Sequence, residues 1–175
     1  MKEALIIVVF GRPGSGKTYF ASRLAHSIGA IHLSSDEIRH QLLRHRTYTI
    51  DEKRMVYDRL FDTTMRLAYS GKSVVLDATF YKAALRQKLE NSARSLGISP
   101  IYIEVKADLS IIKERLAWKR EYSEADYAVY EKVSRAFEPL DKPHLVLDSE
   151  RQITDMLDEA IAYLELHLET LKMSD

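Results

Sequence analysis

The chain has 175 residues, and its 26 Lys and Arg residues are balanced by 26 Asp and Glu residues, so the formal net charge is zero. This length suits one domain with a sizeable core, and the zero net charge argues against a general nucleic-acid coat protein. The chain has no cysteine, which excludes disulfides, thiolate chemistry and cysteine-based zinc sites. The longest apolar run, residues 4–10, is too short to span a bilayer, and residues 1–3 leave no room for a signal peptide. We expect a soluble cytoplasmic protein with no membrane association.

Apolar segments alternate with amphipathic segments along the chain. The apolar segments predict buried parallel strands at residues 4–10, 30–33, 73–77, 100–105 and 144–148. Helical spacing and capping signals predict helices at about residues 17–27, 34–43, 49–70, 81–96, 108–119 and 123–137, with a final helix after residue 149. Five strands alternating with helices indicate a three-layer α/β fold with a five-stranded, mostly parallel sheet.

Several predicted helices begin with the spacing of a capping box, in which a side chain accepts a hydrogen bond from the backbone N–H three residues later. The pairs with this spacing are Ser34 with Glu37, Thr49 with Glu52, Ser123 with Asp126, and Ser149 with Gln152. Glycine is typical of the position just after a helix, and Gly29 and Gly71 predict two helix ends.

A glycine-rich stretch joins the first strand to the first helix. Its sequence, Gly11-Arg12-Pro13-Gly14-Ser15-Gly16-Lys17-Thr18, matches the G-x-x-x-x-G-K-[ST] pattern of a phosphate-binding loop. Glycines allow backbone N–H groups to converge on a polyphosphate, and the positive end of the following helix faces the same anion. Lys17 would reach the β- and γ-phosphates, and Thr18 would ligate Mg²⁺. A chance match is the alternative, but the strand before and the helix after make it rare. We therefore expect ATP and Mg²⁺ as ligands.

Two residues after the second predicted strand form a candidate acceptor site. Ligands of parallel sheets bind at the carboxyl ends of the strands, where Asp36 and Arg39 lie one helical turn apart. Asp36 could take a proton from an acceptor hydroxyl, and Arg39 could hold an anionic or hydroxylated substrate. The alternative is structural, with Asp36 favouring the helix dipole and Arg39 acting as its ion-pair partner.

A third candidate is Asp77, which ends the predicted strand at residues 73–77. A carboxylate at this place either binds Mg²⁺ or contacts the substrate in phosphoryl-transfer enzymes; the alternative is a residue that begins a turn. Asp77 has no acidic neighbour in the sequence, which favours transfer to a substrate over hydrolysis of ATP.

Two arginines flank the end of the helix after the fourth strand, within a predicted lid at about residues 115–126. If that helix ends between Arg115 and Arg120, one of them could lie over the triphosphate as an arginine finger. The alternative is a solvated helix face, because other charged residues surround them. A basic run at residues 39–46 could attract the phosphates of a nucleotide or oligonucleotide, or could be an ordinary polar face.

Together these motifs resemble the P-loop kinase family that includes phage-type polynucleotide 5′-hydroxyl kinases, zeta-toxin-like kinases and AAA-type "predicted kinases". The resemblance covers residues 4–150. Asp36-x-x-Arg39 is similar to the acceptor motif of the polynucleotide kinases, and residues 75–79 resemble the central strand with its aspartate. Residues 115–126 resemble the lid, and residues 137–139 the end of the helix behind it.

The resemblance implies roles for individual residues. Asp36 would be the general base, Arg39 would hold the substrate phosphate, and Arg120 would be the transition-state arginine. Asp77 and Arg86, the basic residue on the helix after the third strand, would contact the substrate.

We therefore predict that residues 1–175 form a single kinase domain that transfers the γ-phosphoryl group of Mg·ATP to a hydroxyl group. Asp36-x-x-Arg39 and the basic run favour a polynucleotide 5′-hydroxyl or a nucleotide as acceptor. A small metabolite such as a sugar, sugar acid or nucleoside is the second candidate. A non-catalytic ATP-binding switch and a slow ATPase are further alternatives. No obligate protein partner is expected.

Overall fold

The structure is a computed structural model, and it describes residues 4–43, 49–117 and 127–174. Every predicted strand and helix has a counterpart. The strands are β1 (Ile6–Phe10), β2 (Ile31–Ser34), β3 (Val74–Asp77), β4 (Ile101–Lys106) and β5 (Leu145–Asp148). The helices are α1 (Lys17–Ile28), α2 (Ser35–Leu42), α3 (Ile50–Tyr69), α4 (Ala83–Arg94), α5 (Leu109–Ala117), α6 (Tyr127–Arg135) and α7 (Ile153–Ser174).

The strands form one sheet in the order β2-β3-β1-β4-β5, and all four neighbouring pairs are parallel. The prediction of a five-stranded, mostly parallel sheet is thus confirmed. All five residues of the central strand β1 are buried, as expected for a strand with neighbours on both edges and helices on both faces. The register pairs Val9 of β1 and Ser34 of β2 with Asp77, which places the ends of these strands side by side.

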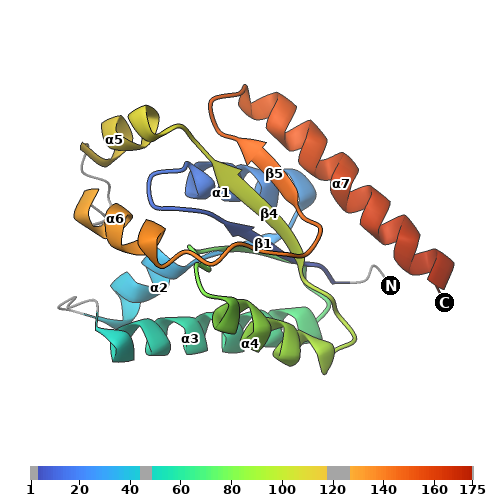
Figure 1. Ribbon diagram of the computed structural model, residues 1–175. Coiled ribbons are helices and arrows are strands. Elements are labelled where there is room, and N and C mark those ends of the chain that lie inside the picture. The colour runs from blue at the N-terminus through green and yellow to red at the C-terminus, as the bar shows by residue number, and fades with distance from the viewer. Residues whose placement is uncertain (1–3, 44–48, 118–126, 175) are drawn as a thin grey trace.

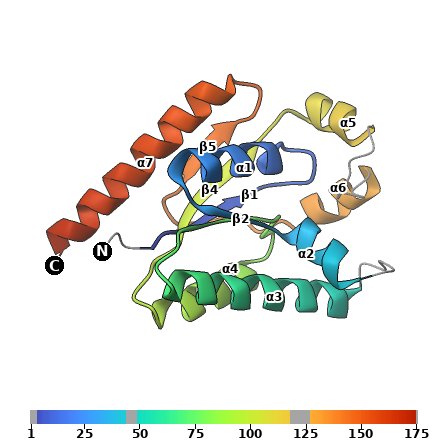
Figure 2. The ribbon, with the colours of Figure 1, turned by 180° about the vertical axis from the view of Figure 1, so that it is seen from behind.

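Helices cover both faces of the sheet, giving the predicted three layers (Figure 1). Ile6, Val8 and Phe10 of β1 point to the face covered by α3 and α4, and join that core. The alternate residues Ile7 and Val9 point to the face covered by α1 and α7. The view from behind shows the same separation, with α3 below the sheet and α7 above it (Figure 2). This alternation follows from the two-residue period of a strand.

The helix starts follow the predicted caps only in part. The Thr49 hydroxyl accepts a hydrogen bond from the Glu52 N–H at 3.3 Å, as predicted. The prediction for Ser34 is wrong, because this residue is still the last residue of β2 and its buried side chain makes no capping hydrogen bond. The Ser149 hydroxyl accepts a hydrogen bond from Arg115, a residue that also contacts the glycine loop described below. Ser123 lies outside the described residues.

Candidate active site

The predicted phosphate-binding loop connects β1 to α1 and has the backbone conformation that its glycines allow. Gly11, Gly14 and Gly16 have φ angles of +153°, +79° and +93°, which side-chain-bearing residues rarely adopt. Gly16 is the N-cap of α1 and provides no side-chain cap. The first N–H groups of α1 therefore remain directed at the loop, where an anion can accept from them.

The loop is also closely packed against its surroundings, and at Gly11 too closely for a side chain. A Cβ atom at Gly11 would lie 2.3 Å from the carbonyl oxygen of Val105 in β4. A Cβ atom at Gly16 would lie 3.1 Å from Nη1 of Arg115 and 3.2 Å from Cβ of Ser149. The loop is thus held between β4, α5 and the segment after β5.

Arg115 of α5 lies beside this loop, and its predicted contact with a nucleotide stays a prediction. Its Nη1 donates to the carbonyl of Gly14 at 3.3 Å and to the hydroxyl of Ser149 at 2.7 Å, and its Nη2 donates to the carbonyl of Ser149 at 3.3 Å. One guanidinium group therefore brings a permanent positive charge to the loop. Arg120 and the rest of the predicted lid from residue 118 to 126 lie outside the described residues.

Asp77 lies at the carboxyl end of β3. On one side is the end of β1, which leads into the glycine loop, and on the other is the end of β2, which leads into α2. The Asp77 side chain is 2% exposed, and neither carboxylate oxygen accepts a hydrogen bond within the described residues. His32 Nε2 lies 3.5 Å from Oδ2 and makes no hydrogen bond to it. A buried carboxylate in such surroundings is costly unless a cation neutralises it. His32 would pair with this carboxylate if its ring were protonated, and when His32 is neutral Asp77 could serve as a ligand for a bound cation.

Asp36 and Arg39 both lie on α2, which follows β2. Asp36 is in the first turn and is half-buried, whereas the Arg39 residue is only 7% exposed. Nη1 of Arg39 lies 3.9 Å from Oε2 of Glu52, a buried residue in the first turn of α3. Arg39 is therefore not on a solvated helix face, and a carboxylate of α3 lies close to its guanidinium group.

Tyr57 of α3 adds a buried hydroxyl group to the same region. It accepts a hydrogen bond from the N–H of Phe80 at 3.2 Å and lies 3.4 Å from Oγ1 of Thr79. Burial is the main cause that raises the pKa of Tyr57 to about 12, and the nearby charge of Asp36 adds to the rise. Tyr57 has no sequence signature of a functional residue, because a tyrosine at an apolar helix position is typical of core packing.

Phe80 has a φ angle of +43°, which makes it the one non-glycine residue with a positive φ in the described part of the chain. For an L-residue this conformation costs roughly 1–2 kcal/mol. Arg86 of α4, only 3% exposed, donates to the carbonyl of Phe80 at 2.7 Å. It also donates to the carbonyls of Glu138 and Pro139, each at 2.9 Å. The structure thus gives Arg86 three backbone partners, and its predicted contact with a substrate stays a prediction.

The segment after α6 is bonded to the loop between β3 and α4. The Glu138 carboxylate accepts from Lys82 Nζ at 2.8 Å and from the N–H of Ala83 at 2.7 Å. These hydrogen bonds, that from Lys82 first, lower the pKa of Glu138. The Glu138 N–H in turn donates to the carbonyl of Tyr81 at 2.8 Å. Residues that the sequence analysis matched only by resemblance therefore hold the loop between β3 and α4.

The family model described as an AAA domain matches residues 6–140, more than half of the chain. The chain therefore belongs to this AAA domain family. No curated protein matches the sequence. In the part of the chain that the structure describes, no helix has both the length and the apolar character needed to cross a membrane.

Solved structures of a gluconokinase, an APS kinase and Kti12 share the fold. A gluconokinase from Sinorhizobium meliloti 1021 is 19% identical with a TM-score of 0.77, and the match covers 100% of this chain and 99% of that chain. The APS kinase CysC of Mycobacterium tuberculosis, in complex with AMPPNP and APS, is 20% identical with a TM-score of 0.73, over 93% and 98% of the two chains. Kti12 from Chaetomium thermophilum, in complex with ADP-AlF3, is 21% identical with a TM-score of 0.70, over 90% and 97%. At these identities the likeness establishes the α/β P-loop kinase fold.

Proposed function

We propose that this protein is an ATP-dependent kinase that transfers the γ-phosphoryl group of ATP to a hydroxyl group of an acceptor. One observation carries the proposal. The glycine loop follows β1, Asp36 follows β2, and Asp77 ends β3 between them; the register places Val9, Asp77 and Ser34 level with one another. A donor site and a carboxylate that can serve an acceptor therefore share one edge of the sheet, where ligands of such sheets bind.

The donor half is formed by residues Gly11 to Thr18. Their backbone N–H groups would bind the phosphates, and Lys17 at the first position of α1 would neutralise the transferred group. Thr18 and the buried carboxylate of Asp77 would hold Mg²⁺, whose bound charge would neutralise the phosphate oxygens. Arg115 would contact the nucleotide from α5, and Arg120 would be the transition-state arginine.

The acceptor half is centred on Asp36. Its carboxylate would take the proton of the acceptor hydroxyl as the acceptor oxygen forms a bond to the γ-phosphorus. The bond between the γ-phosphorus and the bridging oxygen breaks, and ADP leaves with that oxygen. Arg39, whose guanidinium group lies near Glu52, would orient the acceptor.

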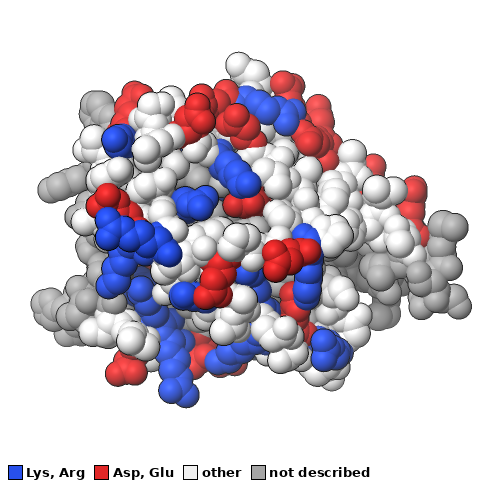
Figure 3. Space-filling view, viewed as in Figure 1, with Lys and Arg blue, Asp and Glu red and all other residues white. Residues whose placement is uncertain are grey.

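The acceptor that we favour is a polynucleotide 5′-hydroxyl or a nucleotide. The arginine of the Asp36-x-x-Arg39 pair suits a phosphate group. Lys and Arg side chains also gather over α6 and beside the beginning of α3, at the side of the molecule where the loop lies (Figure 3). A basic surface of this kind would attract a phosphate backbone.

A small metabolite is the second candidate. The net charge of the chain is zero, which does not suit a long polyanion, and one protein with the same fold is a gluconokinase. The two candidates differ in their response to salt. Affinity for an oligonucleotide would fall steeply as salt rises, whereas affinity for a neutral sugar would change little.

The experiment is a phosphoryl-transfer screen. The protein is incubated with Mg²⁺, γ-labelled ATP and separate acceptors, namely 5′-hydroxyl oligonucleotides, nucleosides, nucleotides, sugars and sugar acids. We expect label in an oligonucleotide or nucleotide, and a loss of roughly 100-fold in rate for Lys17→Ala. Lys72→Ala, which changes a lysine between α3 and β3, is the matched control and should keep the full rate.

Three results would contradict the proposal. Near-full rates with Lys17→Ala would show that the loop takes no part in phosphoryl transfer. Labelled inorganic phosphate without a labelled acceptor would indicate an ATPase. Tight ATP binding without any labelled product would indicate a nucleotide-binding switch.

A further inference from the structure

We propose that Tyr57 is a positioning residue for phosphoryl transfer, a role that rests on the function proposed above. Its hydroxyl group and the guanidinium group of Arg86 together fix the segment from Asp77 to Phe80. This segment connects β3 to α4, and it includes the candidate cation ligand Asp77 and Thr79. We name these two side chains the Tyr57–Arg86 clamp.

The segment needs a clamp because of Phe80. This residue is fully buried with a φ of +43°, a conformation that a bulky aromatic residue adopts only under constraint from its surroundings. Its ring packs against Tyr57, at a centroid distance of 5.4 Å, and against Phe61, at 6.1 Å. The packing holds the ring but does not by itself fix the peptide groups on either side.

The clamp binds both backbone polar groups of Phe80, its N–H and its carbonyl. The Phe80 N–H donates to the Tyr57 hydroxyl at 3.2 Å, and the Phe80 carbonyl accepts from Nη1 of Arg86 at 2.7 Å. The Tyr57 hydroxyl also lies 3.4 Å from Oγ1 of Thr79, so it fixes the position of two successive residues. Because Tyr57 and Arg86 come from different helices, their joint hold locates the segment relative to both α3 and α4.

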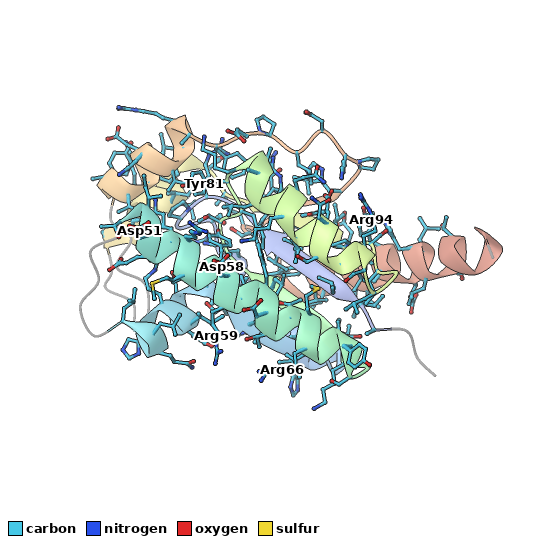
Figure 4. The ribbon with its side chains drawn as sticks, turned by 90° about the horizontal axis from the view of Figure 1, so that it is seen from below. Asp51, Asp58, Arg59, Arg66, Tyr81 and Arg94 are labelled. Atoms are coloured by element: carbon cyan, nitrogen blue, oxygen red, sulfur yellow. The ribbon has the colours of Figure 1, made fainter. Side chains whose placement is uncertain are left out.

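The place of the clamp connects it with the reaction. Strained non-glycine residues that the surroundings maintain concentrate at functional sites. Here the strained residue lies three positions after Asp77, and the register places Asp77 beside Ser34, two residues before Asp36. Figure 4 shows Tyr81, the next residue along, at the same end of the α3–α4 pair as Asp51, with Arg94 at the other end. Loss of the clamp should therefore displace Thr79 and Asp77 relative to Asp36.

The test uses the full chain with Tyr57→Phe, which removes the hydroxyl group and keeps the ring. Tyr102→Phe is the matched control, because Tyr102 is buried to the same degree and its hydroxyl donates to Glu90 at 3.1 Å, with no hydrogen bond to residues 77–80 in the part of the chain that the structure describes. We expect Tyr57→Phe to lower kcat/KM for the acceptor by about 10-fold to 100-fold, while KM for ATP stays within about twofold. Tyr102→Phe should change neither quantity by more than about twofold.

A second measurement is independent of turnover. Hydrogen exchange of peptides covering residues 78–82 should be faster in Tyr57→Phe than in the wild type, and unchanged in Tyr102→Phe. Unchanged exchange in Tyr57→Phe, or an unchanged acceptor kcat/KM, would overturn the proposal, as would an equal effect of both variants. If the wild-type protein labels no acceptor, it is the proposed function that fails, and the exchange data alone then decide whether the clamp exists.

Discussion

Nη1 of Arg115 lies within hydrogen-bonding distance of two acceptors, the Ser149 hydroxyl at 2.7 Å and the Gly14 carbonyl at 3.3 Å. A single nitrogen atom thus joins α5, the segment after β5 and the phosphate-binding loop. If the protein acts as proposed, the guanidinium charge would be in place before a nucleotide binds, so little reorganisation would be needed on binding.

The first prediction separates the charge of Arg115 from its anchoring. Ser149→Ala removes the short hydrogen bond and keeps the guanidinium group, so we expect the Kd for a non-hydrolysable ATP analogue to rise about twofold to tenfold. Arg115→Ala removes the charge as well and should raise Kd by about 10-fold to 100-fold. Titration calorimetry measures both values. Arg94→Ala, at the far end of the α3–α4 pair in Figure 4, is the control. Equal effects of the Ser149 and Arg115 variants would show that the charge itself contributes nothing.

The second prediction compares two glycines with positive φ angles. Gly71 has φ +79° and open space around a Cβ atom, so Gly71→Ala should lower the free energy of unfolding by about 1–2 kcal/mol through strain alone. Gly11→Ala adds the clash with the Val105 carbonyl, and should cost about 1–3 kcal/mol more. Urea denaturation measures the difference. ATP binding should be lost only in the Gly11 variant, and a Gly11 variant as stable as the Gly71 variant would refute the close packing of the loop.

The third prediction concerns the buried carboxylate of Asp77. Asp77→Asn removes a buried charge that has no hydrogen-bond donor, so the free energy of unfolding without Mg²⁺ should rise by about 1 kcal/mol. The rate of phosphoryl transfer should fall, and the Mg²⁺ concentration for half-maximal rate should increase, because a carboxamide is a weaker ligand for the cation. Thermal denaturation tests the predicted change in stability, and a Mg²⁺ titration of the rate tests the predicted change in cation dependence. A destabilised variant with unchanged Mg²⁺ dependence would mean that Asp77 is structural.

The fourth prediction follows from the raised pKa of Tyr57. A tyrosine in the unfolded chain ionises near pH 10, whereas the pKa of Tyr57 in the folded protein is raised to about 12 by burial. Above about pH 10 the unfolded state therefore binds fewer protons, and the free energy of unfolding falls by up to about 1.4 kcal/mol per pH unit until the folded protein also loses the proton. Denaturation at about pH 9 and about pH 11 measures the slope.

Tyr102 contributes in the same direction, because burial raises its pKa as well. The informative quantity is therefore the difference in pH dependence between the wild type and Tyr57→Phe. Above about pH 10 the free energy of unfolding of Tyr57→Phe should fall less steeply, because one tyrosine with a raised pKa is gone. The same slope in both proteins would show that Tyr57 ionises as it does in water.

Sequence reasoning found the strands, the glycine loop and the residues at the strand ends, because each has a local signature. The partners of those residues have none. Arg86 donates to carbonyls 52 and 53 residues later in the chain, and Tyr57 accepts from an N–H 23 residues later. Such contacts depend on how α3, α4 and the segment after α6 pack, which no short pattern encodes.

The capping prediction for Ser34 failed for a related reason. The spacing to Glu37 is that of a capping box, but the sheet keeps the backbone of Ser34 paired with Asp77 and its side chain buried. At Thr49 no strand competes, and the predicted cap forms. A local signal therefore holds only where the tertiary structure leaves the residue available.

The order of strands has a consequence for biogenesis. β1 carries the loop, yet both of its neighbours are distant in sequence, as the hydrogen bond from the Leu5 N–H to Ser73 Oγ across 68 residues illustrates. On the ribosome β1 emerges well before β3 and β4, and an apolar parallel strand without neighbours is prone to aggregation. The pairing of β1 is therefore complete only once β4 has been made, and a ligand of the glycine loop could stabilise only the completed sheet.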